Sequence, residues 1–381
     1  MDKFGYQRGF DIFNRHLDTV SKICQRYGLH PMIWSDMYFR MGSKTMDYYD
    51  PAAVIPPEVG SMIPKSVDLV YWDYYHTDKD FYLDWIRQHR KLGFEPLMAS
   101  GVWTWSRFWY DHRQTVATVT PCIEACRDEK VGELFFTLWG DDGAYCEYDS
   151  CLAGLAWAAE FAWHGHADEQ AAAEKFATIC ADDYHRNCAL GELEYPCGTD
   201  EIPGHLLLWD DPLLGINWNN NSTVNPQWAE LAIQTFKHIV AQTESSGREA
   251  ENADLDHIRR LLRAMIGKLE LRRTLLDAYA RRDRAKLEFI AHTMVPEVMS
   301  VLKSLLQSFR RQWMRRNKTF GFETIQLRLN AQIGRYEEIG VRIEELLYDG
   351  FNGIPELDEI PPAINGGGYW IRCYASGSAI I

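Results

Sequence analysis

The 381-residue sequence lacks several features that would assign it to a common protein class. It has no CxxC pair, and its nine cysteines, an odd number, form no regular framework, which argues against zinc and disulfide scaffolds. No Gly-x-Gly-x-x-Gly follows an expected strand, so nothing points to a dinucleotide-binding fold. No apolar run approaches the roughly 20 residues that a membrane span needs, and no signal peptide precedes residue 30. We therefore expect a reduced, cytoplasmic chain.

Positive charge is also in deficit, because the formal net charge is -14. An acidic surface repels nucleic acid and anionic membranes, so we expect neither as a partner. Aromatic residues, in contrast, are plentiful at 13%, with 14 Trp and 19 Tyr. Most will fill the core. Flat rings also pack on the apolar faces of sugars, so the composition favours a sugar binder slightly.

Short apolar stretches alternate with helical patterns over the first 165 residues. Such alternation predicts βαβ units and a parallel sheet. The expected strands are 31–34, 67–72, 95–100 and 133–139, and the expected helices are 10–27, 78–92, 113–127 and 150–163.

Four strands would make half of a closed barrel. The chain opens on a helix, and a half-barrel would leave two long sheet edges unpaired. We therefore expect an α/β fold, the C-terminal half of a (β/α)₈ TIM-type barrel over residues 1–166, followed by an all-α domain. The missing half is expected upstream of Met1, with a second chain as the alternative source. A doubly wound open sheet is the other fold considered.

A different pattern begins near residue 167. We expect a connecting helix and irregular segment over 167–227, a helical bundle over 228–350, and a C-terminal extension of loop and strand over 351–381. The arginine pairs of the second long helix are predicted to lie on its solvated flank. The bundle is also where we expect a homodimer interface. The expected long helices are 228–245, 252–282, 285–314 and 322–348.

Polar and aromatic residues gather where the expected strands end. Barrel enzymes place their chemistry at the C-terminal ends of strands, so we expect these clusters to line one pocket. The clusters are Trp34-Ser35-Asp36, Tyr71-Trp72-Asp73, Trp103-Thr104-Trp105 and Trp139-Gly140-Asp141-Asp142.

These strand-end stretches resemble the family 20 glycoside hydrolases, the β-N-acetylhexosaminidases, and specifically a bacterial branch with a helical C-terminal domain. The matching stretches are PMIWSDMYFR (31–40), DLVYWDYY (68–75), SGVWTW (100–105) and FTLWGDDGAYC (136–146). The resemblance is looser over 166–381. It implies an exo-acting enzyme that removes terminal N-acetylglucosamine or N-acetylgalactosamine from glycans.

The resemblance also implies substrate-assisted catalysis, in which the acetamido oxygen of the sugar attacks the anomeric carbon. In the family an Asp-Glu pair at the end of the fourth barrel strand orients the acetamido group and protonates the leaving oxygen. Stretch 31–34 looks like the fifth strand, so we expect this pair before Met1. The Asp-Glu pairs considered, 128–129, 168–169 and 358–359, lie outside the expected strand ends. We therefore expect the 381-residue chain alone to be inactive.

By resemblance, the remaining pocket residues divide the contacts to the sugar. Tyr71 would orient the acetamido group, Asp73 would bind hydroxyls and Trp139 would form part of an aromatic box. Asp141 would hold O4 and O6 in place of the Glu found in much of the family, which leaves the preference between the two sugars open. Trp34, Asp36, Trp103 and Trp105 are the other substrate-binding candidates. No cofactor and no metal are expected.

Each of these residues also has a plain structural interpretation. A single Trp at a strand end is more often core, and Asp36 could simply cap the following segment. Tyr71 and Trp72 alternate, so one faces the barrel interior and the other the helices; the resemblance puts Tyr71 inside. Two other functions remain. One is a non-catalytic sugar-binding or scaffold half-barrel completed by a partner chain, and the other is a glycosidase that uses Asp73 and Asp141 as acid and base.

Overall fold

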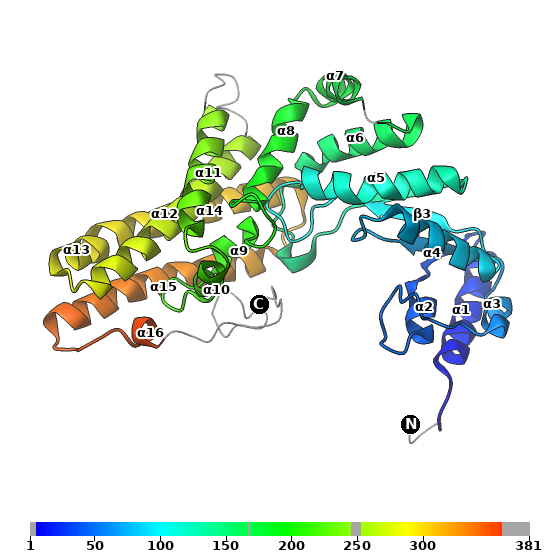
Figure 1. Cartoon of the computed structure of the whole chain (residues 1–381), viewed down its shortest axis with the longest axis horizontal. Coiled ribbons are helices and arrows are strands. Elements are labelled where there is room, and N and C mark those ends of the chain that lie inside the picture. The colour runs from blue at the N-terminus through cyan, green and yellow to red at the C-terminus, as the bar shows by residue number, and fades with distance from the viewer. Residues whose placement is uncertain (1–4, 167, 245–252, 360–381) are drawn as a thin grey trace. The chain divides into compact units, whose positions relative to one another are not determined.

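The computed structural model describes residues 5–166, 168–244 and 253–359, in two compact units (Figure 1). The first unit comprises residues 1–103, 112–138 and 151–185, and the second 104–111, 139–150 and 186–381. Each is described by itself. The segments that follow the third and fourth strands therefore cluster with the helical part of the chain. Residues 168–185, expected in a connecting segment, cluster with the sheet.

The first unit is built on a parallel sheet of four strands in the order β1-β2-β3-β4. Their register is regular: Trp34 pairs with Val70, Tyr71 with Met98, and Ala99 with Phe135. Parallel pairing of consecutive strands is what the alternating pattern predicts, and it is confirmed. The strands are β1 Met32–Trp34, β2 Asp68–Trp72, β3 Leu97–Gly101 and β4 Leu134–Thr137.

Helices connect these strands close to the predicted bounds. Asp78 caps α4 by accepting a hydrogen bond from the Asp80 amide at 3.0 Å, and Gly93 follows the helix with φ +82°, a conformation that favours glycine. The helices of this unit are α1 Gly9–Arg26, α2 Asp36–Gly42, α3 Pro57–Met62, α4 Lys79–Lys91, α5 His112–Asp128, α6 Cys151–His164 and α7 Glu169–Cys180.

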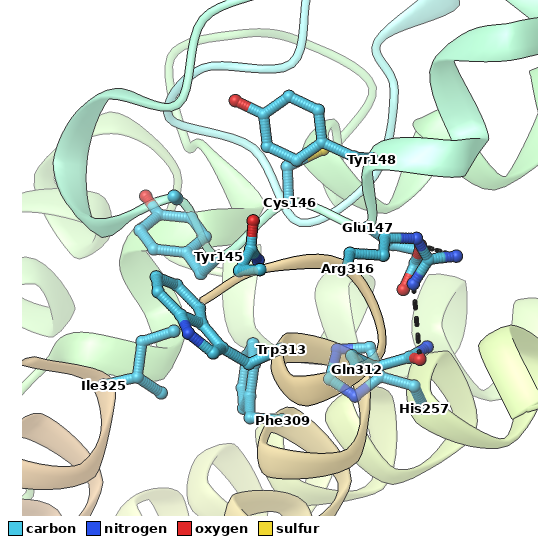
Figure 2. Close-up of a pocket in the computed structure, with 12 residues that line it drawn as sticks. Tyr145, Cys146, Glu147, Tyr148, His257, Phe309, Gln312, Trp313, Arg316 and Ile325 are labelled. Atoms are coloured by element: carbon cyan, nitrogen blue, oxygen red, sulfur yellow. Dashed lines mark hydrogen bonds and ion pairs between the residues drawn. The ribbon is translucent and has the colours of Figure 1, made fainter. Parts of the chain in front are cut away.

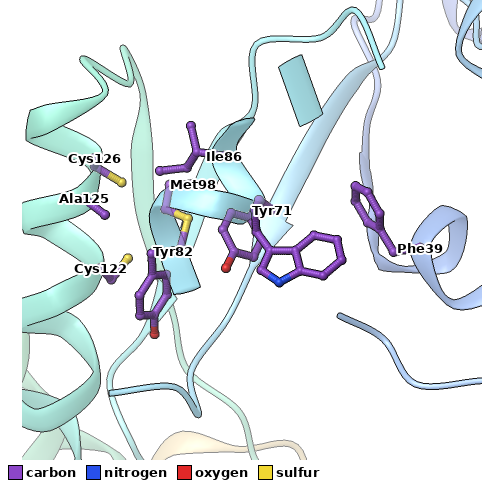
Figure 3. Packing of buried hydrophobic residues seen from close by; sticks show 9 residues of the cluster. Phe39, Tyr71, Tyr82, Ile86, Met98, Cys122, Ala125 and Cys126 are labelled. Atoms are coloured by element: carbon purple, nitrogen blue, oxygen red, sulfur yellow. The ribbon is translucent and has the colours of Figure 1, made fainter. Parts of the chain in front are cut away.

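One face of the sheet is buried beneath helices. Figure 3 shows Tyr71 and Met98 on this face together with Tyr82 of α4 and Cys122 of α5. These side chains form one apolar cluster and are at most 1% exposed. The eight cysteines within the described residues are free thiols.

The opposite face of the sheet is more open, and the sheet curves around it. The rings of Trp34 on β1 and Phe135 on β4 lie 6.3 Å apart between centroids, although β1 and β4 are the outermost strands. Successive side chains of a strand point to opposite faces. Ile33 and Leu134 pack toward the helices, so their neighbours Trp34 and Phe135 lie on the open face. A curved sequential sheet suits half of a barrel, and that assignment stays a prediction.

The second unit is dominated by long helices. α14 packs against both α12 and α15, and Figure 1 shows the three running beside one another. A π-helical turn, Ile290–Met294, joins α13 to α14. The helices beyond α7 are α8 Tyr184–Leu190 at the boundary of the units, η3 Gly191–Glu194, α9 Gly204–Trp209, α10 Ile216–Val224, α11 Trp228–Glu244, α12 Ala253–Ala280, α13 Arg284–Phe289, α14 Val295–Arg316, α15 Phe322–Tyr348 and α16 Pro355–Asp358.

The helical segment Arg284–Arg316 is long and apolar enough, by length and composition alone, to cross a membrane. This finding qualifies the expectation that no apolar stretch would reach that length. One side of the segment packs against the other helices, with Leu302, Leu305 and Phe309 buried there, as in an amphipathic helix.

The expectation of a connecting helix followed by an irregular segment over 167–227 is partly wrong, because α9 and α10 lie within the part expected to be irregular. The Asn-rich run 217–221 is helical. The Asp210 carboxylate accepts hydrogen bonds from the backbone amides of Asn217 and Trp218 at 3.0 and 2.9 Å, which caps the first turn of α10. This cap comes from a residue outside the helix, so helical spacing in the sequence does not reveal it. Of the expected C-terminal extension, residues 360–381 lie outside the described residues.

The expectation that the arginine pairs of α12 lie on a solvated flank is also wrong for one arginine in each of two pairs. Arg259 and Arg272 are buried, whereas Arg260 and Arg273 are not. Both buried guanidinium groups donate to backbone oxygens: Arg259 to the Thr243 carbonyl, and Arg272 to two carbonyls of the loop after α9. Burial of a charged group is tolerable when such hydrogen bonds replace those of water.

Lys268 of α12 provides a test of this buried polar network. Its ammonium group donates to the carbonyl oxygens of Leu208 and Asp210 at 2.7 and 2.9 Å, and to the Gln332 side chain. We expect Lys268→Met to lower the free energy of unfolding by about 2–4 kcal/mol, because those oxygens lose their donor inside the protein. Lys303→Met, at an exposed position on α14, should change it by less than about 0.5 kcal/mol. Urea denaturation measures both, and equal effects would contradict the proposed anchoring.

Candidate functional site

The ends of β1, β2 and β3 bring aromatic and acidic side chains together in the first unit. The Trp72 indole N–H donates to Asp36 at 2.8 Å, and the Trp103 indole N–H donates to the Tyr74 carbonyl at 3.1 Å. The rings of Tyr75 and Trp103 meet edge to face, 5.5 Å apart between centroids. We name Asp36, Trp72, Asp73, Tyr75 and Trp103 the strand-end cluster. The expectation that the strand-end clusters line one pocket stays a prediction.

Trp34 is the predicted site residue of this unit with the most accessible ring. It is 38% exposed and lies on the open face of the sheet, against Phe135 of β4. An aromatic ring on the open face of a curved sheet offers a flat apolar surface on which a sugar ring could pack. Trp103, in contrast, is buried, so its indole supports the cluster from within.

Asp73 is held entirely by the protein. Its carboxylate accepts from the backbone amides of Tyr75 and His76 at 3.0 and 3.3 Å, from the Tyr71 hydroxyl at 3.3 Å, and lies 2.7 Å from His76 Nδ1. The side chain is 1% exposed. In this arrangement Asp73 orders the end of β2, and the geometry does not favour it as a direct ligand of sugar hydroxyls or as a catalytic acid.

The interpretation that Tyr71 faces the barrel interior is contradicted by the packing. Tyr71 is fully buried on the helix-covered face with Tyr82 and Met98 (Figure 3). Because side chains alternate along a strand, Trp72 points to the opposite face. Burial raises the pKa of Tyr71 well above its ordinary value. Its hydroxyl bonds Asp73, so Tyr71 supports the strand end from behind the sheet. Alternation alone leaves two choices of face, and helix packing decides between them.

Asp36, the other acidic residue of the strand-end cluster, has a partly desolvated carboxyl group. Burial raises its pKa, while the hydrogen bond from Trp72 opposes that rise. Asp36 is the first residue of α2 and Ser35 is the N-cap, so the interpretation of Asp36 as the capping residue is not supported. A carboxylate in the first turn is still favoured by the helix dipole. The bond of Asp36 to the indole joins the ends of two strands and fixes the orientation of Trp72.

The other predicted site residues belong to the second unit. Trp105 is buried, and the Trp139 carbonyl accepts a hydrogen bond from the Thr104 hydroxyl at 2.9 Å. Asp141 is exposed and opens a 3₁₀ turn, η1 Asp141–Gly143. The segment that carries Trp139 and Asp141, residues 139–150, is named the β4 loop below.

A charged cluster in the second unit was not predicted from the sequence. Arg316 of α14 lies 2.6 Å from a carboxylate oxygen of Glu147 (Figure 2). It also bonds Asp149 and lies 3.4 Å from Asp254 of α12. The three carboxylate groups lie within 4.8 Å of one another and could hold a cation, but the Arg316 guanidinium already contacts all three. Their positions, 147, 149, 254 and 316, share no sequence motif that could have revealed the cluster.

A small cavity of about 30 Å³ adjoins this cluster. Glu147, Tyr145 and Trp313 are among the residues that line it, as Figure 2 shows. Glu147 is 2% exposed, and one of its carboxylate oxygens has no hydrogen-bond partner. Burial and the nearby Asp254 charge raise the pKa of Glu147 to about 8, although Arg316 and Arg315 oppose the rise.

The Asp-Glu pairs lie away from the ends of the described strands. Pair 128–129 ends α5, pair 168–169 starts α7 and pair 358–359 ends α16. A fourth pair, 200–201, was missed in the sequence and lies in a turn before α9. Within the described residues, therefore, no Asp-Glu pair occupies the position that the resemblance requires of a catalytic pair.

Comparison with known families adds independent evidence on the class of protein. Residues 192–365 match the family model described as the Glycoside Hydrolase 20C C-terminal domain. The matched span begins in η3 and includes the whole helical bundle, with Lys268 and Arg316. This match supports a glycoside hydrolase and, within that class, membership of family 20. No curated protein matches the chain.

Glu147 makes the stability of the second unit depend on pH. Its folded-state pKa of about 8 exceeds the ordinary value of 4.5, so the folded state binds a proton that the unfolded chain releases. This contribution is fully present below about pH 4.5 and is lost as pH rises through about 8. We expect the urea midpoint of the wild type to fall relative to that of Glu147→Gln across this window. Parallel curves for the two proteins would show that the pKa is not raised.

Proposed function

We propose that the chain is part of an exo-β-N-acetylhexosaminidase that removes terminal N-acetylglucosamine or N-acetylgalactosamine from glycans. The observation that carries the proposal is the strand-end cluster, in which three consecutive parallel strands end in aromatic and acidic side chains. Enzymes with parallel barrels build their sites at this end of the strands. The family 20C match over 192–365 supports the same class independently.

The chemistry proposed is substrate-assisted. The acetamido oxygen of the sugar attacks the anomeric carbon, and an Asp-Glu pair, absent from the described strand ends, orients the acetamido group and protonates the leaving oxygen. In this chain we assign Trp34 and Trp139 to the aromatic walls, and exposed Asp141 to the sugar hydroxyls. Asp36 and Asp73 order the strand ends on which the aromatic side chains stand. A cytoplasmic location and a homodimer through the helices stay predictions.

Sugar binding tests this assignment directly. We expect the purified 381-residue chain to bind N-acetylglucosamine, measured by changes in tryptophan fluorescence or by NMR titration. Trp34→Ala should weaken binding about tenfold, which corresponds to a loss of about 1.4 kcal/mol. Trp163→Ala removes another tryptophan, one that is 83% exposed on α6, and should leave the affinity unchanged. Absence of binding by the wild type, or equal losses in both variants, would refute the assignment.

Turnover provides the second test. We expect no measurable hydrolysis of an aryl N-acetylglucosaminide by the 381-residue chain, because general acid catalysis is worth roughly 10²–10⁴-fold and the expected donor is missing from the described strand ends. Steady release of the aryl group by the purified chain would contradict this expectation and would require a different acid.

A non-catalytic sugar-binding half-barrel is the second candidate. It is favoured by the position of the Asp-Glu pairs and by Asp73, whose oxygens are fully engaged within the protein. The two candidates agree on sugar binding but differ in gene structure. A continuous upstream reading frame that encodes four more strands and an Asp-Glu pair supports the enzyme, whereas a separate partner gene supports the binding subunit.

A further inference from the structure

The β4 loop is attached to the helical bundle at Glu147. The Glu147 amide donates to the Phe108 carbonyl at 3.0 Å, and its own carbonyl accepts from the Ser150 amide at 3.1 Å. Its side chain is buried against Arg316 of α14 at 2.6 Å. Arg316 also bonds Asp149, so one guanidinium group contacts two carboxylates of the loop and a third, Asp254, on α12. The loop is therefore held at this point by the matched C-terminal domain.

The conformation of the β4 loop requires such external support. Ala144 has φ +52°, in the left-handed region that costs a non-glycine residue roughly 1–2 kcal/mol. Gly143 has φ +108°, and a Cβ added there would lie 3.3 Å from the Arg328 side chain of α15. A segment with unfavourable backbone angles keeps them when surrounding contacts enforce them. Here the surrounding contacts come from the bundle.

The attachment point lies close to the predicted sugar-binding residues. A Cβ added to Gly140 would lie 2.5 Å from the Tyr148 hydroxyl, so the Tyr148 ring packs directly against the residue between Trp139 and Asp141. Tyr148 is the immediate neighbour of Glu147. A displacement of Glu147 would therefore move Tyr148, and with it the backbone that presents Trp139 and Asp141.

We propose that Arg316 is a positioning residue, through which the helical domain sets the placement of Trp139 and Asp141 for sugar binding. This inference rests on the proposed function. Without Arg316, Glu147 and Asp149 lose the guanidinium group that connects them to α14, and the β4 loop is released from the helix. The helical domain would then act as a support for sugar recognition and not only as an appended module.

The test compares three variants of the 381-residue chain. Arg316→Gln removes the charge, and Arg316→Lys restores a cation. Arg311→Gln is the matched control, because Arg311 lies on the same helix and pairs with Asp256 at 3.3 Å. We expect hydrogen exchange of the amides in 139–150 to become about tenfold faster in Arg316→Gln, to be largely restored in Arg316→Lys, and to stay unchanged in Arg311→Gln.

A second readout is the affinity for N-acetylglucosamine, which should fall about tenfold in Arg316→Gln and stay unchanged in Arg311→Gln. Unchanged exchange in Arg316→Gln, or faster exchange with unchanged sugar affinity, would overturn the proposal. A wild type that binds no sugar refutes the proposed function, while the exchange data still decide whether Arg316 holds the loop. Should Arg316→Gln fail to fold, Asp149→Asn at an exposed position should loosen the loop in the same direction, and unchanged exchange there counts against the proposal.

Discussion

Parallel pairing of four short strands is the constraint on which the first unit depends. Because consecutive strands run in the same direction, their C-terminal ends meet at one edge, and the residues that follow them are forced together. Alternation then divides each strand between a helix-covered face and an open face. At the end of β2 this division places Tyr71 among the helices and Trp72 with Asp36. The face on which each side chain lies therefore decides which side chains are available at the strand ends.

In the second unit, positively charged side chains on the long helices hold the irregular segments in place. Lys268 donates to the Asp210 carbonyl and Arg272 to the Pro212 carbonyl in the loop after α9, and Arg316 contacts two carboxylates of the β4 loop. In each case a cation on a long helix contacts polar groups of an irregular segment. The bundle thus determines the conformation of loops that follow strands of the sheet, which explains why 104–111 and 139–150 cluster with it.

The order and type of the secondary-structure elements could be predicted because they depend on local patterns. Helical spacing and the glycine at residue 93 placed α4 within a residue of its observed bounds, and short apolar stretches located all four strands. The helix α10 was missed, since its asparagine-rich sequence is stabilised by a cap from Asp210. The site was predicted in part: the residues at the strand ends were found, but their orientation and their hydrogen-bond partners were not.

By itself, the sequence determined the parallel βαβ order, the strand ends at Asp36, Trp72 and Trp103 where aromatic and acidic residues gather, and the long helices that follow. These features depend on periodicity and on residues adjacent in the chain. Only the tertiary structure decided that Tyr71 lies behind the sheet and that Arg316 meets Glu147. Those outcomes depend on packing and desolvation between segments far apart in the sequence, and no local pattern records which segments will meet.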